Sequence, residues 1–443
     1  MDNQQDFTTG AIYSKLLGFM VPALLALMLQ SLYGAVDTLI IGRFGTLAGI
    51  SGVSVGSNVM MILGALFGGL SVGVTVLIGV YLGQSRTDRI TALIGNSTFF
   101  YLVAVSVASV LLVIFARPLA NLLQTPPEAV DSAVTYIRIC GAGFIFTNFY
   151  YYVSGIFRAM GNSKLPLLFV AIACVVNIFG DLLLVAVFKM DVAGAAIATV
   201  FAQALSLFLS LRILRKKDLP FTFSLKEIRP GPEIGRFVKI GLPVGLQEIL
   251  TSLTFTALCA FVNKMGLAAS SGYGVAGKIT GFIMLVPSAI MECMSPFVSQ
   301  NVGACREDRA RKGMLYGMLT GAGVGAVFCL TTIFFGDRIA GLFTTDAGCI
   351  GCAALYLKGF AADCVLTPLL FSLMGYFNGH ARSGIVMWQG LAQSLLVRLP
   401  VSWYFSTRAS LTGVGLACPL ATAFGIALCM VFYFRLQKEL DAQ

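Results

Sequence analysis

Long apolar runs separated by short polar breaks dominate this chain. A helix that crosses a bilayer needs about 20 predominantly apolar residues, and the 443 residues form a near-continuous series of such runs. The pattern predicts about twelve membrane-spanning helices, because the alternating strands of about ten residues that a membrane β-barrel requires are not found. The helices are expected to start near Gly18, Val53, Ile90, Ser132, Leu165 and Val192, and then near Phe237, Gly272, Gly313, Cys352, Ser383 and Thr412.

Composition indicates that lipid is the main solvent of the folded chain. Hydrophobic residues make up 57% of the sequence and charged residues only 11%, whereas a soluble domain carries about 25% charged residues. The sequence also holds 48 glycines, which suit closely packed membrane helices because small residues let helix backbones approach each other.

The net charge of +10 is spread over the breaks between the apolar runs. With the N-terminus placed inside, most lysine and arginine residues fall in inward segments, which is the positive-inside pattern. Both termini are therefore expected in the cytosol, on a multi-pass protein of the plasma (inner) membrane. Asp2 and Asp6 stand where a signal peptide would carry basic residues, so we expect no cleavable leader. We expect no nucleic-acid partner, because no recognition motif accompanies the charge.

The chain reads as two related halves. The longest polar stretch, residues 215–235, is interpreted as a cytosolic linker between an N-terminal six-helix lobe, 1–214, and a C-terminal six-helix lobe, 236–443. The halves repeat at an offset of about 220 residues: GQSRTDR at 83–89 pairs with GACREDR at 303–309, and GIFRAMGNS at 155–163 pairs with GYFNGHARS at 375–383. The predicted fold is an all-α membrane protein, with twelve transmembrane helices in two six-helix repeats related by a pseudo-two-fold axis along the membrane normal.

Three segments carry a family resemblance. They are PALLALMLQSLYGAVDTLIIG at 22–42, RAMGNSKLPLLFVAIACVVNIFGD at 158–181, and VAGAAIAT at 192–199. Together they resemble the multidrug and toxic compound extrusion (MATE) family, in its prokaryotic DinF-like branch, over nearly the whole chain. The resemblance implies a secondary active exporter without a cofactor, which exchanges H+ or Na+ for organic, often cationic, drugs or toxic metabolites by alternating access.

The resemblance also implies a cation-coupling site in the N-terminal lobe. Positions that match Asp37 and Asp181 supply carboxylates, and those that match Asn177 and Thr199 supply neutral oxygens. Elementary physics agrees, because ionisable groups inside a membrane are costly and usually functional, and Asn177 and Asp181 lie four residues apart on one helix face. Two carboxylates in a low-dielectric lobe repel each other, so one or both could hold a proton, and such oxygens also suit Na+. Pro22 is expected to bend the first helix and take part in gating, a passive kink being the alternative.

The second repeat departs from the first. Leu258, Val397 and Val401 stand at the positions that match Asp37, Asn177 and Asp181. Another bacterial branch of the family uses acidic residues on helices 7 and 10, and Glu248 and Asp363 lie there, about one turn away from the expected positions. Both are candidate substrate-facing acids, with structural pairing to Lys278, Lys358 or Arg398 as the alternative.

Two smaller features are open to simple interpretations. His380, the only histidine, is interpreted as a solvated residue of a cytosolic loop. Cys349 and Cys352 form a C-x-x-C pair without a second pair or a nearby histidine, so no zinc site is expected, and a disulfide or an incidental pair are both open.

Other functions are weighed against the transporter. A flippase, or an exporter of a lipid-linked or specific metabolite, is the alternative, although such proteins tend to carry basic residues toward their cavity, whereas the helices here carry acids. An enzyme is not expected, because neither D-x-x-D nor H-E-x-x-H occurs, and the absence of an ATP-binding P-loop points to an ion gradient as the energy source. We expect a monomer whose partners are a small-molecule substrate and membrane lipid.

Overall fold

The computed structural model describes residues 6–216, 221 and 225–442, and these are almost entirely helical. The first repeat contains α1 (Ile12–Phe44), α2 (Leu47–Gly83), α3 (Thr87–Ile114), α4 (Ala116–Leu122), η1 (Pro127–Ala129), α5 (Val130–Ala142), α6 (Phe144–Ala159), α7 (Lys164–Asp181), η2 (Leu182–Val187) and α8 (Asp191–Lys216). After η3 (Leu225–Glu227), the second contains α9 (Glu233–Asn263), α10 (Leu267–Ile283), α11 (Leu285–Gly303), α12 (Glu307–Ala340), α13 (Ala347–Phe360), α14 (Asp363–Gly379), α15 (Ser383–Ala392), η4 (Gln393–Arg398), α16 (Leu399–Thr407) and α17 (Leu411–Asp441).

The described helices include many that could cross a membrane. Nine are long and apolar enough to cross a membrane, and two bent pairs raise the number to eleven. One pair joins Pro127–Ala142 to Phe144–Ala159 at 49°, and the other joins Ala347–Phe360 to Asp363–Gly379 at 48°. The run of α15, η4 and α16 forms a further continuous helical segment, at the place where the sequence predicts another span. Helices begin at or shortly before their predicted starts, since polar residues extend them beyond the apolar run.

The chain divides into two compact units whose boundaries fall inside helices. One unit contains Val21–Gly245, and the other contains Phe7–Met20 and Leu246–Gln443. The boundaries thus lie within α1 and α9, whereas the predicted lobes, 1–214 and 236–443, are divided by the polar linker. Those lobes, and the axis that relates the two repeats, stay predictions.

Hydrogen bonds explain why the start of the chain groups with the second unit. The main-chain oxygen of Phe7 accepts from Nδ2 of Asn301 at 3.2 Å and from Nη2 of Arg309 at 3.0 Å. The Phe7 ring lies 5.4 Å from the ring of Phe297, centroid to centroid. The segment that leads into α1 is therefore held by α11 and α12.

Close backbone packing explains why the first part of α9 belongs to the first unit. A Cβ atom at Gly73 of α2 would lie 2.3 Å from the carbonyl oxygen of Phe237, and one at Gly69 would lie 2.2 Å from the nitrogen of Gly245. Only glycine allows two helix backbones to come this close. The first part of α9 therefore packs on α2 in the first unit.

An ion-paired carboxylate reinforces that attachment. Glu233, the first residue of α9, has a side chain that is 3% exposed and accepts from the hydroxyl of Tyr81 at 2.7 Å. Its Oε1 lies 3.2 Å from Nη1 of Arg89 and 2.5 Å from Nη1 of Arg236. The middle of the predicted linker, residues 217–220 and 222–224, lies outside the described residues.

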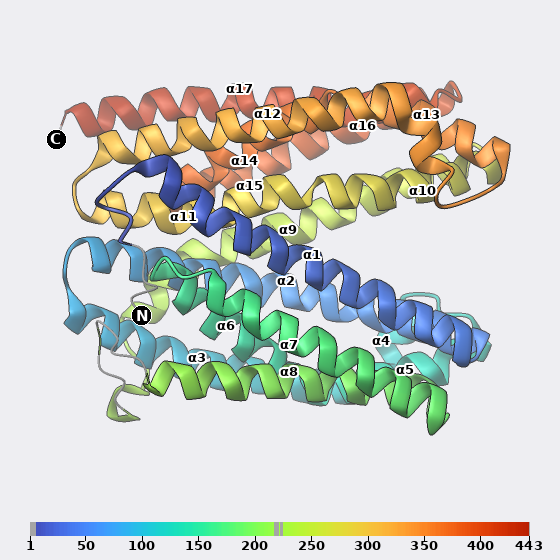
Figure 1. Ribbon diagram of the computed structural model, residues 1–443, viewed down its shortest axis with the longest axis horizontal. Coiled ribbons are helices and arrows are strands. Elements are labelled where there is room, and N and C mark those ends of the chain that lie inside the picture. The colour runs from blue at the N-terminus through green and yellow to red at the C-terminus, as the bar shows by residue number, and fades with distance from the viewer. Residues whose placement is uncertain (1–5, 217–220, 222–224, 443) are drawn as a thin grey trace. The chain divides into compact units, whose positions relative to one another are not determined.

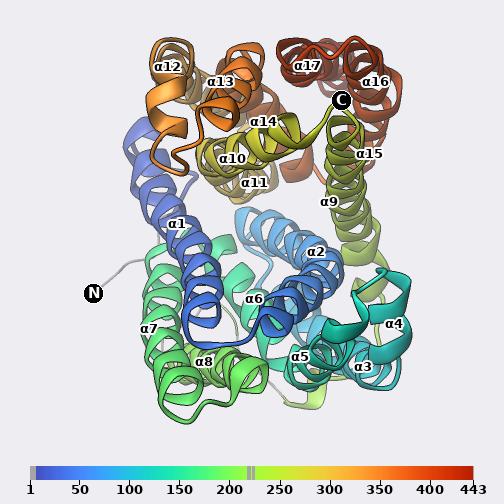
Figure 2. The same cartoon turned by 90° about the vertical axis from the view of Figure 1, so that its right-hand side faces the viewer.

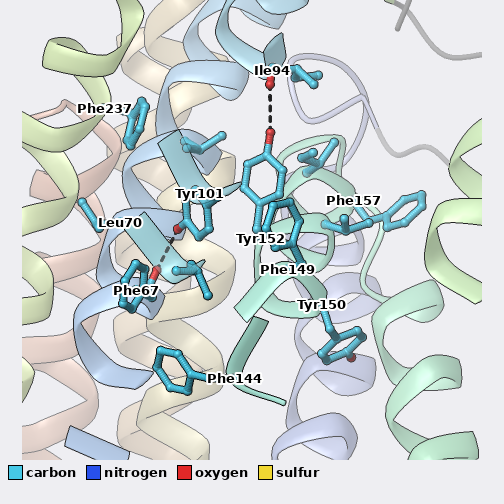
Figure 3. Close-up of a cluster of buried hydrophobic side chains, with 14 of the residues drawn as sticks. Phe67, Leu70, Ile94, Tyr101, Phe144, Phe149, Tyr150, Tyr152, Phe157 and Phe237 are labelled. Carbon is cyan, nitrogen blue, oxygen red and sulfur yellow. Dashed lines mark hydrogen bonds between the residues drawn. The ribbon is translucent and has the colours of Figure 1, made fainter. Parts of the chain in front are cut away.

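Aromatic side chains fill the interior of the first unit. Helices α7 and α8 run side by side (Figures 1 and 2), and α2 packs against α5 and α6. Figure 3 shows Tyr101 among Phe67, Phe149 and Tyr152, with its hydroxyl donating to the carbonyl of Phe67 at 2.8 Å. A buried tyrosine needs such an acceptor, so the Tyr101 hydroxyl is paired within the apolar core.

The second unit packs around α14. This helix contacts α11, α12 and α17, and α13 contacts α10 and α17. Cys349 is buried and Cys352 is half-buried, and both thiols are free. The C-x-x-C pair does not form a disulfide in this structure.

Candidate coupling site

Three helices of the first unit bring the four predicted coupling residues together. Asp37 lies on α1, Asn177 and Asp181 lie on the last turn and a half of α7, and Thr199 lies on α8. Asp37, Asn177 and Asp181 are all buried. Residues from three separated segments thus meet inside one unit.

The amide of Asn177 links the two carboxylates. Carboxylate oxygens only accept, so the amide is oriented with its nitrogen toward them. It then donates to Oδ1 of Asp37 at 2.7 Å and to Oδ2 of Asp181 at 3.3 Å. The hydroxyl of Thr199 lies 3.5 Å from Oδ2 of Asp37. It lies 3.4 Å from the Asn177 amide atom that faces away from the carboxylates, which is the oxygen in this orientation.

The two carboxyl groups are close enough to influence each other electrostatically. A hydrogen bond between them would require a proton on one of the two groups. Oδ1 of Asp181 is buried without a hydrogen-bond partner among the described residues. No arginine or lysine is among the groups that act on either carboxyl. Two buried acids without a basic neighbour repel each other when both are charged.

Small residues and an irregular turn position the α7–α8 pair. A Cβ at Gly180 would lie 2.9 Å from the Cβ of Ala198, so the two helices approach closely next to Thr199. The wider π-helical turn η2 begins directly after Asp181, and such turns occur frequently at functional sites. The small-residue segment at 192–199 therefore serves to bring α8 onto the carboxylates.

Three residues of this site were not predicted. Tyr33 is buried close to Asp37 and Thr199. Tyr136 and Cys140 of α5 also lie within electrostatic reach of Asp37. Tyr33 precedes Asp37 by four residues, so helical spacing was a usable signal. The residues on α5 give no such signal.

Pro22 lies inside α1, which continues through it as a helix. Proline lacks the N–H that would bond four residues back, which leaves a helix locally easier to bend. The boundary between the two units falls between Met20 and Val21, and the boundary in α9 falls two residues after Pro243. Both helices therefore change unit next to a proline that interrupts their hydrogen bonding.

The two acids considered in the second repeat have different neighbours. Glu248 is exposed, and Glu292 of α11 is the acid that acts on it. Asp363 is buried at the bend between α13 and α14, where the charge of Arg398 acts on it. Of the three basic residues considered as its partners, Arg398 is the one that the structure brings to Asp363.

The expectation of a solvated histidine was wrong. The His380 side chain is 4% exposed, and its Nε2 lies 2.9 Å from Oε2 of Glu307. The hydroxyl of Tyr376 donates to the same carboxylate. His380 follows the end of α14 as the loop residue we expected, but the first turn of α12 covers it. No pattern along the chain indicates that packing.

The comparisons agree with this architecture. The chain matches the MatE family over residues 22–183 and 243–404, one match in each repeat. It is similar to the multidrug export protein MepA of Staphylococcus saprophyticus, with 26% identity over 444 residues that cover 98% of this chain and 96% of the relative. MepA of Staphylococcus aureus strain NCTC 8325 is 24% identical over 441 residues, covering 98% and 96%.

Solved structures share the fold. A multidrug resistance MATE transporter of the MOP superfamily in its outward-facing conformation matches with a TM-score of 0.91 at 18% identity, covering 99% of this chain and 98% of that one. A mutant of the Vibrio cholerae MATE transporter VcmN matches with a TM-score of 0.90 at 18% identity, covering 98% of each chain.

Two matches to one transporter family, one in each helical repeat, identify a membrane transporter rather than an enzyme. The chain belongs to the MatE family, the multidrug and toxic compound extrusion transporters. Members of this family work without a cofactor.

Proposed function

We propose that the protein exports organic, often cationic, small molecules in exchange for H+ or Na+ that binds between Asp37 and Asp181. The observation that carries the proposal is the buried carboxylate pair, which has no basic side chain among the groups that act on it. Burying an unpaired charge in a low-dielectric medium is expensive. Occupancy by a proton or a cation therefore stabilises the closed cluster, and its release leaves a negative site that attracts the next cation.

Either ion fits the donor set. A proton shared between the two neighbouring carboxyl groups would remove their mutual repulsion. A sodium ion takes oxygen ligands, and Asp37, Asp181, Asn177 and Thr199 supply them once the amide turns its oxygen inward. The two ions differ in what they demand of Asn177, because only sodium needs the amide oxygen.

Ion binding is coupled to gating through α1 in this proposal. Asp37 and Pro22 lie on the same helix, so a change in the carboxylate contacts alters the force on the proline. Exchange of an ion at Asp37 would then bias α1 between a straighter and a more bent form, and alternating access follows from that bias. The DinF-like branch remains our assignment on the residues of the first repeat.

Glu248 is proposed as a substrate-facing acid. It is exposed in the middle of α9, and a charged group exposed at that depth faces water rather than lipid. An organic cation would find a carboxylate there. Asp363 is not proposed for the same role, because its neighbour Arg398 offsets its charge.

The setting of the transporter is also proposed. Positive residues in the inward segments support cytosolic termini and a place in the plasma (inner) membrane. Twelve spans with their own buried coupling site support action as a monomer surrounded by lipid.

Transport in liposomes tests the proposal. The purified protein is reconstituted, a pH gradient or a Na+ gradient is imposed, and the movement of ethidium is followed. We expect one gradient to drive transport by the wild type and neither to drive it in Asp37→Asn. Asp131→Asn is the matched control, because Asp131 forms an exposed pair with Arg117 at 2.6 Å and is not among the groups that act on Asp37 or Asp181, so its removal should leave transport intact.

The outcome also separates the alternative function. If Asp37→Asn transports like the wild type, the coupling site is wrong. If neither gradient moves ethidium, while a fluorescent lipid-linked sugar crosses the membrane, the flippase alternative replaces the drug exporter.

A further inference from the structure

A repeated turn motif joins α2 to α3 in the first repeat and α11 to α12 in the second. GQSRTDR at 83–89 and GACREDR at 303–309 agree at their first, fourth, sixth and seventh positions. Ser85 and Cys305, at the third position, both have a positive φ, of 57° and 56°. The N–H at the fourth position bonds to the carbonyl five residues back in both copies, across 2.9 Å and 2.8 Å. The two turns therefore have the same backbone, and neither belongs to the coupling site.

The last arginine of the second copy holds the lead-in segment, residues 7–10, which precedes α1. Nη2 of Arg309 donates to the carbonyl oxygens of Phe7 and Thr9, at 3.0 Å and 3.1 Å. Its Nη1 donates to the carbonyl oxygen of Gly10 at 3.0 Å. A guanidinium presents its donors in one rigid plane, which suits several acceptors at once. One side chain thus binds three main-chain oxygens of the segment.

Other groups of the second unit hold the same segment. The N–H of Phe7 donates to Oε1 of Gln300 at 3.1 Å, and Nη1 of Arg306 donates to the carbonyl oxygen of the next residue at 2.7 Å. The Phe7 side chain is 0% exposed. Its ring centroid lies 5.7 Å from that of Phe19 on α1 and 5.4 Å from that of Phe297 on α11. The lead-in segment is therefore fixed through both its main chain and a buried ring.

The last arginine of the first copy holds the start of α9 instead. Nη1 of Arg89 lies 3.2 Å from Oε1 of Glu233, the first residue of that helix. Tyr81 also donates to this carboxylate, and it stands eight residues before its arginine, as Asn301 does before Arg309. Asn301 in turn donates to the lead-in segment at 3.2 Å. In each repeat, the motif thus anchors the helix that opens the other repeat.

The two anchors differ in how many side chains share the task. Glu233 accepts from Tyr81 at 2.7 Å and lies 2.5 Å from Nη1 of Arg236, in addition to its contact with Arg89. Loss of Arg89 therefore leaves two donors on that carboxylate. In the second repeat, three bonds to the lead-in segment come from the single side chain of Arg309. The start of α1 consequently depends more on its motif arginine than the start of α9 does.

We propose that Arg309 is a positioning residue for transport, which fixes the start of α1 so that ion exchange at Asp37 bends this helix at Pro22. Helix α1 begins in the second unit and carries Asp37 in the first, and Pro22 lies next to the boundary. A helix with a free start would shift as a whole when the force at Asp37 changes. A helix fixed at its start bends where its hydrogen bonding is interrupted. The inference rests on the proposed coupling at Asp37 and supplies the fixed point that such coupling requires.

Hydrogen–deuterium exchange of the purified full-length protein in detergent measures whether the lead-in segment is docked. We expect Arg309→Gln to speed exchange in residues 7–16 severalfold, because a segment without its anchor opens more often. Phe7→Ala should have the same effect, since it removes the buried ring and leaves α12 unchanged. Exchange as slow as in the wild type in both variants would overturn the proposal.

Transport and ion binding are measured on the same preparations. Arg309→Gln and Phe7→Ala should slow ethidium efflux severalfold, because α1 no longer bends against a fixed start. Ion-dependent thermal stabilisation should report an ion affinity within about twofold of the wild type, since Asp37 keeps its contacts and lies far along the helix from the lead-in segment. An ion affinity that falls in parallel with transport would show general damage to the fold and contradict the positioning role.

A double variant tests whether Arg309 serves the bending at Pro22. Substitutions that act on independent steps multiply their effects on a rate, whereas two that disable one step do not. We expect Arg309→Gln combined with Pro22→Ala to transport no more slowly than the slower of the two single variants. Multiplied losses would assign Arg309 a purely structural role and overturn the proposal.

Arg89→Gln is the matched control, because it removes the equivalent arginine of the first repeat. Exchange in residues 7–16 and ethidium efflux should both stay close to the wild type, since Glu233 keeps its other two donors. An equal loss of transport in Arg89→Gln would remove the special role of Arg309. If Arg309→Gln fails to fold, Phe7→Ala and Arg309→Lys carry the tests. Lysine keeps the charge but loses the planar set of donors, so Arg309→Lys should dock the segment only in part.

The choice of transported compound separates this proposal from the proposed function. If the wild type moves a fluorescent lipid-linked sugar instead of ethidium, and release of the lead-in segment slows that movement, the anchor stands and drug export is wrong. If ethidium is exported equally well by the wild type and by Arg309→Gln with its segment released, the exporter stands and the anchor is wrong.

Discussion

The amide nitrogen of Asn177 on α7 donates to Oδ1 of Asp37 on α1 across 2.7 Å. This bond is shorter than the one to Asp181, at 3.3 Å, and charge-assisted bonds of this kind are among the strong ones. The relative importance of the four coupling residues follows from these distances.

Substitutions in the coupling site should therefore form a ranked series. Asp37→Asn and Asp181→Asn remove a charge and should abolish binding of the coupling ion. Asn177→Ala should weaken it by about tenfold, because a bond to a charged group contributes about 1.5–3 kcal/mol. Thr199→Val should weaken it by less than about threefold, since its contacts are 3.5 Å and 3.4 Å long. Ion-dependent thermal stabilisation in detergent measures the series, and a larger effect at Thr199 than at Asn177 would contradict the site geometry.

Pro22→Ala should separate ion binding from transport. Alanine restores the N–H that proline lacks and stiffens α1 next to the unit boundary. We expect ion binding within about twofold of the wild type, because no contact of Asp37 changes, together with a severalfold slower ethidium efflux. Pro243→Ala should behave similarly. Pro419→Ala is the control, since Pro419 lies inside α17 away from either boundary, and an equal loss of transport there would remove the special role of Pro22.

Glu233→Gln should destabilise the first unit. The carboxylate is buried and holds two arginines and Tyr81, so its neutralisation should cost about 1–3 kcal/mol. Thermal unfolding in detergent should therefore occur at a lower temperature. Glu227→Gln removes a mostly exposed pair with Arg229 at 3.5 Å, and exposed pairs contribute about 0–1 kcal/mol. Equal decreases in the unfolding temperature of Glu233→Gln and Glu227→Gln would contradict this prediction.

His380→Leu should destabilise the second unit. The substitution removes the imidazole Nε2 that lies 2.9 Å from Oε2 of Glu307 in a nearly closed site. Loss of this contact should lower the free energy of unfolding by about 1–3 kcal/mol. His380→Gln keeps a donor at a similar place and should cost less than half as much. The thermal unfolding temperature of the two variants tests this order. Were His380 solvated, both variants would unfold like the wild type.

The sequence by itself determined the architecture and pointed to the candidate coupling site. Helices that cross a membrane must satisfy their backbone hydrogen bonds within one apolar run, so their number and order are visible along the chain. Asp37 and Asp181 stood out because charged groups inside apolar runs are rare, and Asn177 was tied to Asp181 by its spacing of four residues. The two repeats were equally visible, because related segments keep their order.

Only the tertiary structure decided which residues meet across helices. Tyr136 and Cys140 join the coupling site, His380 is covered by α12, and Arg398 rather than a lysine reaches Asp363. The exchange of the first parts of α1 and α9 between the two units is of the same kind. Each depends on the packing of helices that are far apart in the sequence, and periodicity within one helix states which face is polar but not what covers it.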